Sequence, residues 1–124
     1  MGAMVRAPRP DPRQLLPLTP IAFQVLLALA EQHRHGYAII LEVERRTDGL
    51  IRLRTGTLYT AIKRLVELGL VEESDRRPAP EDDDERRRYY RLTDFGRAVM
   101  KAEARRLEAV VALARDTRVL PRHA

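Results

Sequence analysis

Residues 55–69, Thr-Gly-Thr-Leu-Tyr-Thr-Ala-Ile-Lys-Arg-Leu-Val-Glu-Leu-Gly, are the most informative part of this sequence. Its apolar side chains Leu58, Ile62 and Leu65 recur at helical spacing, and at about 100° per residue they lie on one side of a helix. The opposite side is polar, so nothing in the pattern directs it into a core. The stretch therefore predicts an amphipathic helix with one buried face and one free face.

Both ends of this helix are marked by their residue types. Thr55 is expected to cap its start, because a threonine hydroxyl can accept a hydrogen bond from a free first-turn amide. Gly69 suits the left-handed residue that often follows a helix. We therefore expect the helix to cover about residues 56–68.

The free face of this helix carries Thr57, Thr60, Lys63 and Arg64. These hydrogen-bonding and cationic side chains have lengths that reach base edges and phosphates from a helix in the major groove of DNA. A polar helix face is also the ordinary solvated surface of a globular protein. The elements around the helix favour the first interpretation.

Two helices are predicted ahead of this segment. Thr19 followed by Pro20 is a typical helix start, and the apolar pattern continues to about Gln32. A second helix is expected over about residues 36–47, and residues 50–53 alternate only long enough for a short strand. The helix with the free face is therefore the third of a group.

A hairpin and a last helix are predicted after it. Residues 70–73 and 88–92 have the pattern of two strands, and the charged residues 74–87 between them form a long tip. Thr93 is placed to cap a final helix of about 20 residues. The hairpin is therefore expected to form a wing.

This order of elements predicts a fold that is mainly α with a small β-hairpin. We expect a winged helix-turn-helix domain over residues 18–93 and a long C-terminal dimerisation helix with its tail over residues 94–124. The proline-rich residues 1–17 are expected to form a flexible arm. Residues 1–3 resemble a remnant of an expression tag ahead of a native start at Met4.

The final helix carries an apolar stripe that a domain this small cannot cover by itself. A helix of that length spans about 30 Å, so part of the stripe needs a partner. We therefore expect a homodimer. The residues predicted to form its interface are Phe95, Val99, Ala102, Leu107, Val110 and Leu113.

The acidic and basic residues of the wing lie in different parts of its sequence. Its acidic residues gather at the tip and its arginines lie toward the strand ends, so the base of the wing can meet phosphate while the tip is held away. Consecutive carboxylates can also bind a divalent cation, but without a defined loop spacing a solvated run is the ordinary interpretation. The wing residues expected to contact DNA are Arg76, Arg77, Arg86, Arg87 and Arg88.

The composition excludes several classes of protein. The 124 residues carry a net charge of +5, which favours a polyanionic partner, and no cysteine, which leaves no disulfide or thiolate chemistry. Three histidines alone do not make a structural zinc site, so neither a metal nor a cofactor is expected. No transmembrane stretch or signal peptide is recognisable, so we expect a cytoplasmic protein without a membrane partner.

Two functions compete with DNA binding as interpretations of this sequence. An enzyme is disfavoured, because Ser74 is the single serine and the chain has no cysteine nucleophile and no glycine-rich phosphate loop. A winged-helix module that binds protein through its third helix stays open as the alternative. The cationic, apolar-poor outer face of that helix argues against it.

Four segments occur in order along the chain: His-Gly-Tyr-Ala-Ile (35–39), Gly-Thr-Leu-Tyr-Thr-Ala-Ile-Lys-Arg-Leu (56–65), Gly-Leu-Val (69–71) and Arg-Arg-Arg-Tyr-Tyr-Arg-Leu-Thr-Asp-Phe-Gly (86–96). Together they closely resemble the PadR family of bacterial transcriptional regulators. The resemblance implies a homodimer that represses promoters by placing paired recognition helices in successive major grooves of double-stranded DNA. It also implies release by a small molecule or another signal.

The resemblance assigns roles to individual residues. Tyr37 would approach the DNA backbone, although packing at the edge of the core is an equal alternative for Tyr37 and Tyr59. Thr60 stands where the family commonly has proline. Only one helix follows the wing, so a small-molecule effector would lie at the dimer interface. The resemblance places on DNA the residues Tyr37, Thr57, Tyr59, Thr60, Lys63 and Arg64, and we add Thr55 at the start of the third helix.

Overall fold

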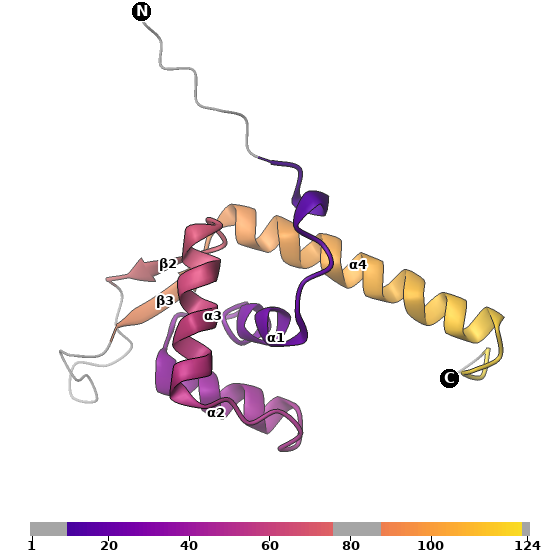
Figure 1. Cartoon of the computed structure of the whole chain (residues 1–124), viewed down its shortest axis with the longest axis horizontal. Coiled ribbons are helices and arrows are strands. Elements are labelled where there is room, and N and C mark those ends of the chain that lie inside the picture. The colour runs from indigo at the N-terminus through magenta and orange to yellow at the C-terminus, as the bar shows by residue number, and fades with distance from the viewer. Residues whose placement is uncertain (1–9, 76–87, 123–124) are drawn as a thin grey trace, which may run out of the picture.

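The computed structural model describes residues 10–75 and 88–122 of the chain. Its helices pack around one core, and α4 extends well beyond the body that α1, α2 and α3 form (Figure 1). The elements in chain order are the 3-10 helix η1 (Pro12–Leu15), α1 (Pro20–Ala28), β1 (Arg34–His35), α2 (Gly36–Arg46), α3 (Thr55–Glu67), β2 (Val71–Ser74), β3 (Tyr89–Leu92) and α4 (Asp94–Asp116). The predicted fold class, mainly α with a small sheet, is confirmed.

The third helix lies where the sequence predicts it, with its apolar face in the core. Leu58, Ile62 and Leu65 are 0%, 3% and 2% exposed, and they belong to the core that α1, α2 and α4 complete. Gly69 follows the helix with a φ of 79°, the left-handed conformation predicted for it. The burial of this face fixes which side of α3 points outward.

The start of α3 differs from the prediction. Thr55 is the first helical residue, not the cap, and Arg54 occupies the N-cap position without a side-chain hydrogen bond to the helix. The expected short strand over residues 50–53 is also absent from the structure. The Thr47 hydroxyl instead accepts from the amide of Ile51 at 3.1 Å, so this segment is a connecting loop held to the end of α2.

The sheet contains one strand beyond the two of the predicted hairpin. β2 and β3 pair antiparallel, with Val71 opposite Leu92, and each begins one residue later than expected. β1 adds two residues, Arg34 and His35, on the other side of β3. A strand this short has no recognisable period, so only its pairing with β3 reveals it.

Helix α1 is shorter than the apolar pattern predicts. Its start is as expected, since the Thr19 hydroxyl accepts from the amide of Ala22 at 3.1 Å. It ends at Ala28 and not near Gln32, because the chain must leave the helix in time to enter β1. The predicted end near Gln32 depends on the apolar pattern alone, and that pattern contains no information on pairing with a distant strand.

The N-terminal arm is ordered over the part that the structure describes. The sequence predicted a flexible lead up to residue 17, but η1 lies along α4 (Figure 1). The buried Glu103 of α4 accepts a hydrogen bond from the amide of Leu18 at 2.8 Å and pairs with Arg106. Both contacts lower the pKa of the Glu103 carboxyl, the Arg106 hydrogen bond most. Residues 1–9 lie outside the described part.

Three arginines from three different elements meet at the C-terminal end of α1. Arg46 of α2 donates to the Leu27 carbonyl at 3.0 Å, Arg34 of β1 to the Ala28 carbonyl at 2.6 Å, and Arg97 of α4 to the Ala30 carbonyl at 2.9 Å. Carbonyls at a helix end lack partners within the helix and carry partial negative charge, so guanidinium groups stabilise them. We call this cluster the arginine junction.

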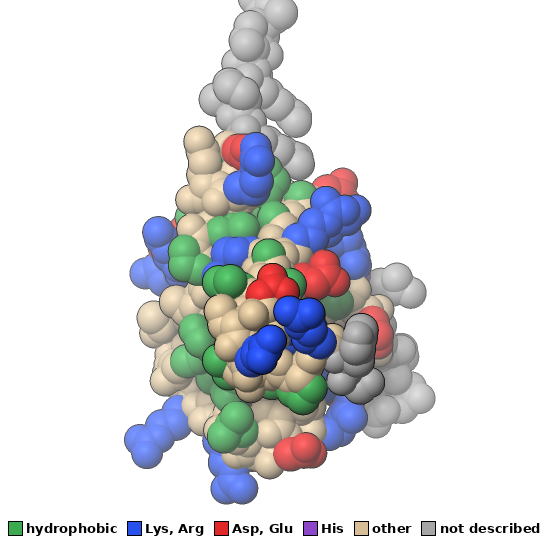
Figure 2. Space-filling model, turned by 90° about the vertical axis from the view of Figure 1, so that its right-hand side faces the viewer, with side chains coloured by type: hydrophobic (Ala, Val, Ile, Leu, Met, Phe, Trp, Pro, Cys, Tyr) green, Lys and Arg blue, Asp and Glu red, His purple; other side chains and the backbone are tan. Residues whose placement is uncertain are grey.

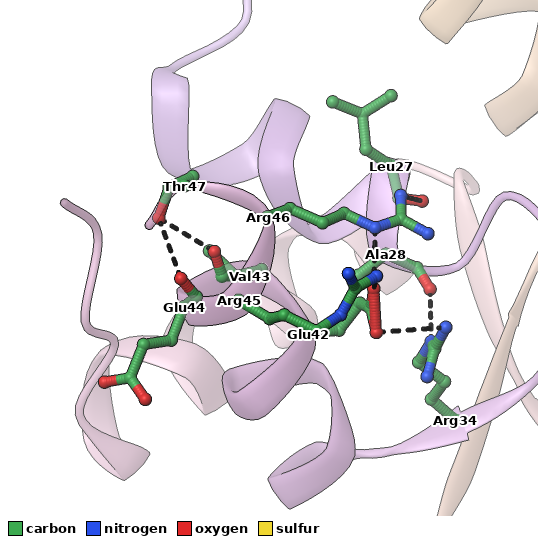
Figure 3. A network of polar contacts seen from close by, with 9 residues as sticks. All are labelled: Leu27, Ala28, Arg34, Glu42, Val43, Glu44, Arg45, Arg46 and Thr47. Atoms are coloured by element: carbon green, nitrogen blue, oxygen red, sulfur yellow. Dashed lines mark hydrogen bonds and ion pairs between the residues drawn. The ribbon is translucent and has the colours of Figure 1, made fainter. Parts of the chain in front are cut away.

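Glu42 lies beside two members of the arginine junction (Figure 3). Its carboxylate pairs with Arg45, accepts from Arg46 Nε at 2.8 Å and lies 3.5 Å from Arg34 Nη2. The hydrogen bonds from Arg45 and Arg46, aided by the charge of Arg34, lower the pKa of Glu42 from 4.5 to about 2. Since its side chain is 10% exposed, this carboxylate is expected to contribute to stability.

We expect Glu42→Gln to lower the free energy of unfolding by about 2 kcal/mol at pH 7. The folded-state pKa lies below the unfolded one, so this contribution is complete above about pH 5 and disappears as the pH falls toward 2. Urea unfolding of both proteins at pH 7 and pH 3 measures it. The control is Glu44→Gln, since Glu44 is more exposed and lies 3.4 Å from Arg52. A difference between wild type and Glu42→Gln that stays constant with pH would contradict the assignment.

Candidate DNA-binding surface

The outward face of α3 presents polar side chains to solvent, as the sequence predicts. Thr57, Thr60, Lys63 and Arg64 are all exposed, directly opposite the buried face of the same helix. Thr55 and Gly56 at its first turn are exposed as well. A Cβ at Gly56 would meet nothing within 4 Å, so this end of the helix is open to a large partner.

The start of α2 lies against α3 and enlarges this face. A Cβ added at Gly36 would overlap the Tyr59 hydroxyl and lie 2.8 Å from its Cζ, so a larger residue here would make the end of the Tyr59 ring shift. Tyr59 remains 45% exposed and the neighbouring Tyr37 60% exposed. The two tyrosines therefore differ. Tyr59 packs in part against α2, whereas Tyr37 is available to a partner.

His35 fixes the start of α2. Its Nδ1 accepts from the amide of Ala38 at 3.1 Å, which makes it the N-cap of the helix. Its ring also contacts Tyr89 of β3 edge-on, with centroids 5.3 Å apart. The position of Tyr37 is thus tied to the sheet as well as to α3. The sequence identified the His-Gly-Tyr segment by resemblance but did not reveal this capping role.

The cations of this surface differ in their pairing. Arg64 lies 3.9 Å from Glu67, and Arg88 at the base of the wing lies 3.4 Å from Glu73. Lys63 makes no ion pair with any residue in the ranges 10–75 and 88–122. Because Arg88 is already paired with Glu73, it would have to release this carboxylate in order to bind a DNA phosphate. The other predicted wing arginines, Arg76, Arg77, Arg86 and Arg87, lie outside the described residues.

Two further arginines lie at the N-terminal end of α3 and were not among the predicted site residues. Arg52 lies 3.4 Å from Glu44. Arg54 is exposed and makes no ion pair within the described part of the chain. The signal in the sequence is the pair Arg52 and Arg54, two cations directly before the helix that carries the free polar face.

The predicted dimerisation residues divide into two groups. Phe95 and Val99 are 8% and 0% exposed and belong to the core of their own chain, so their assignment to an interface is wrong. Ala102 is half-buried. Leu107, Val110 and Leu113 are 37%, 50% and 61% exposed, beyond the part of α4 that the domain covers. Figure 2, which views the molecule from the end where α4 stops, shows hydrophobic side chains exposed among charged ones.

Nothing in the described ranges suggests a metal centre or a membrane segment. No three His, Asp or Glu side chains gather there in a way that could hold an ion. None of the helices that the structure describes is both long enough and apolar enough to cross a bilayer.

Comparisons with known proteins agree with this geometry. Residues 25–102 match the family described as transcriptional regulator PadR-like. A transcriptional regulator from Clostridium thermocellum superposes with a TM-score of 0.64 at 27% identity, covering 77% of this chain and 87% of that one. A PadR family transcription regulator from Clostridium difficile gives 0.64 at 22% identity, covering 80% and 98%. PadR of Bacillus subtilis, solved in complex with operator DNA, gives 0.56 at 18% identity, covering 73% and 48%.

Proposed function

Because the chain belongs to the PadR-like family of transcriptional regulators, we propose that it is a homodimeric repressor that binds a specific operator in double-stranded DNA. One observation carries the proposal. The face of α3 that is free of the core holds Thr57, Thr60, Lys63 and Arg64, and its first turn is open. This is the arrangement with which a recognition helix reads the major groove.

The remaining contacts are assigned by position. Tyr59 is exposed in part on α3 and lies against Gly36, next to the exposed Tyr37 on α2, so both tyrosines could meet the sugar-phosphate backbone beside α3. Arg88 marks the base of the wing, which would contact phosphates or the minor groove next to the recognition helix. The Bacillus subtilis PadR was solved on operator DNA, and this chain is similar in fold to the 48% of that protein that it covers.

The homodimer is proposed from the distal half of α4. The helical face that is buried upstream, at Val99 and Glu103, continues as the exposed Leu107, Val110 and Val111. A second copy of the same helix would cover this stripe, and two recognition helices would then face the DNA together. An effector that releases the protein would lie where the two copies meet. The regulator is expected to act in the cytoplasm.

We expect Lys63→Ala to weaken binding to every duplex by about 5- to 10-fold, and to lower the salt dependence by about one phosphate contact. The reason is that Lys63 is exposed and makes no ion pair with the residues that the structure describes, so it can act as a charge toward the DNA backbone. Fluorescence anisotropy across a salt series measures both quantities. The duplexes are a mixed sequence and one selected by the wild-type protein from a random pool.

Lys101→Ala is the matched control, because Lys101 is an exposed lysine on α4, away from α3. Thr57→Ala and Arg64→Ala should instead reduce the preference for the selected duplex over the mixed one. Equal effects of all three α3 variants on both duplexes would show that the roles are wrongly divided. A wild-type affinity that does not change with salt would favour the protein-binding module and overturn DNA binding.

A further inference from the structure

Arg54 occupies the N-cap position of α3, where its residue type is unfavourable for the helix. Its backbone is extended, with φ −83° and ψ 154°, and its side chain makes no capping hydrogen bond. Ser, Thr, Asp and Asn are preferred at this position because their oxygens accept from first-turn amides, and a guanidinium has no acceptor. Its positive charge also lies at the positive end of the helix dipole. The fold therefore gains nothing from an arginine here.

Within the part of the chain that the structure describes, no neighbouring carboxylate pairs with the Arg54 guanidinium. Arg52 has Glu44 at 3.4 Å and Arg64 has Glu67 at 3.9 Å, whereas Arg54 is exposed and unpaired within residues 10–75 and 88–122. An open hollow beside it is lined by both Arg52 and Arg54, with Thr57 of α3 and Thr19 at the start of α1. No Asp or Glu lines this hollow. The local charge is therefore positive and free to meet an anion.

The location of Arg54 indicates which anion. Thr57, on the proposed recognition face, lines the same hollow, and Arg54 precedes it by a single turn of chain. In helix-turn-helix proteins the N-terminal residues of the recognition helix approach the bases, so the residue just before the helix lies at the rim of the groove. The groups at that rim are phosphates, which arginine binds with paired N–H donors.

We propose that Arg54 is a further DNA-contacting residue, whose guanidinium binds a backbone phosphate at the rim of the groove that α3 enters. This inference rests on the proposed function, and adds to it a contact outside the helix. It also explains why an arginine occupies the N-cap. The residue would increase the affinity for DNA while lowering the stability of the unbound protein.

The substitution Arg54→Ser tests this inference, because it should raise the melting temperature of the free protein and lower its affinity for DNA. Serine is a favourable N-cap, so thermal unfolding of the free protein should shift upward by about 3 °C. The affinity for a mixed-sequence duplex should fall by about 5- to 10-fold, and the slope of log affinity against log salt should flatten by about 0.9. Arg54→Lys keeps the charge but loses the paired N–H donors, so it should keep the salt dependence of wild type while binding about 3-fold more weakly.

Arg52→Ser is the matched control, since Arg52 stands two residues before Arg54 and already has a carboxylate partner, Glu44. It should change affinity by less than about 2-fold and should not raise the melting temperature. Arg54→Gln, which removes the charge without introducing a serine cap, should lose affinity like Arg54→Ser and keeps the test valid if that variant fails to fold.

The outcomes are distinct. Wild-type protein that binds with a steep salt dependence, together with Arg54→Ser and Arg54→Gln of unchanged affinity, overturns this inference and leaves the proposed function standing. Wild-type protein that does not bind duplex DNA overturns both. Weaker binding accompanied by a lower melting temperature in both variants would show that Arg54 acts through the fold of α3, and would also overturn the inference.

Discussion

Gly96→Ala is expected to lower the free energy of unfolding by about 3 kcal/mol, a large part of the stability of a domain of this size. A Cβ on Gly96 would overlap the carbonyl oxygen of Leu70 and lie 3.0 Å from its carbonyl carbon. That oxygen cannot turn away freely, because it accepts from the amide of Thr93 at 3.1 Å. Inserting the methyl group would therefore push the first turn of α4 away from the start of β2. Chemical unfolding in urea measures the loss.

Gly56→Ala is the control for this substitution. Gly56 is also a helical glycine, but its added Cβ would meet nothing within 4 Å. Alanine should therefore stabilise the protein by about 0.5–1 kcal/mol, through its higher helix propensity. Opposite signs for the two variants are the expected result. If Gly96→Ala were as stable as Gly56→Ala, the close approach of α4 to Leu70 would be refuted.

Val110→Glu is expected to make the protein monomeric and to weaken operator binding by at least about 100-fold. Val110 is 50% exposed in the single chain and lies in the middle of the distal apolar stripe of α4. A dimer would bury a carboxylate there without a partner, which is costly. Loss of the second subunit then removes the gain in affinity that comes from engaging two half-sites at once. Sedimentation velocity and anisotropy measure the two effects.

Ala112→Glu introduces the same charge on the opposite face of α4, about 160° around the helix from Val110. Ala112 is exposed, and Arg105 and Glu108 are its neighbours on that polar face. This variant should remain dimeric and bind as wild type does. A wild-type protein that sediments as a monomer at micromolar concentration would contradict the dimer itself, whatever the variants do.

The elements that could be predicted from the sequence are those that a local pattern specifies. The buried face of α3 follows from its own helical period, and the start of α4 from Thr93, whose hydroxyl accepts from the amide of Gly96 at 2.9 Å. The family resemblance is confirmed over residues 25–102. In each of these cases the decisive residues are close together in the chain.

The features that could not be predicted depend on distant contacts. The pairing of His35 with Tyr89 across β1 and β3 makes α1 end early. The local sequence pattern of neither strand indicates this pairing. On α4 a single apolar stripe runs from Phe95 to Leu113, but periodicity does not reveal where the domain stops covering it. The core reaches Val99, so the first half of the stripe was wrongly assigned to a partner.

The candidate site shows the same division. The polar face of α3 was predicted because its residues share one helix. The packing of Tyr59 on Gly36 joins two helices, and the pairing of Arg88 with Glu73 joins two strands, so only the structure reveals them. Whether these side chains contact DNA stays a prediction.

The arginine junction would determine the spacing of an operator. Arg34, Arg46 and Arg97 hold the sheet, α2 and α4 to the end of one short helix, so the part that reads DNA and the part proposed to dimerise are joined firmly. The separation of the two recognition helices would then be a property of the protein. Half-sites moved apart by one base pair lie about 3.4 Å farther along the duplex and about 35° farther around it. A protomer without a flexible hinge could not follow both changes.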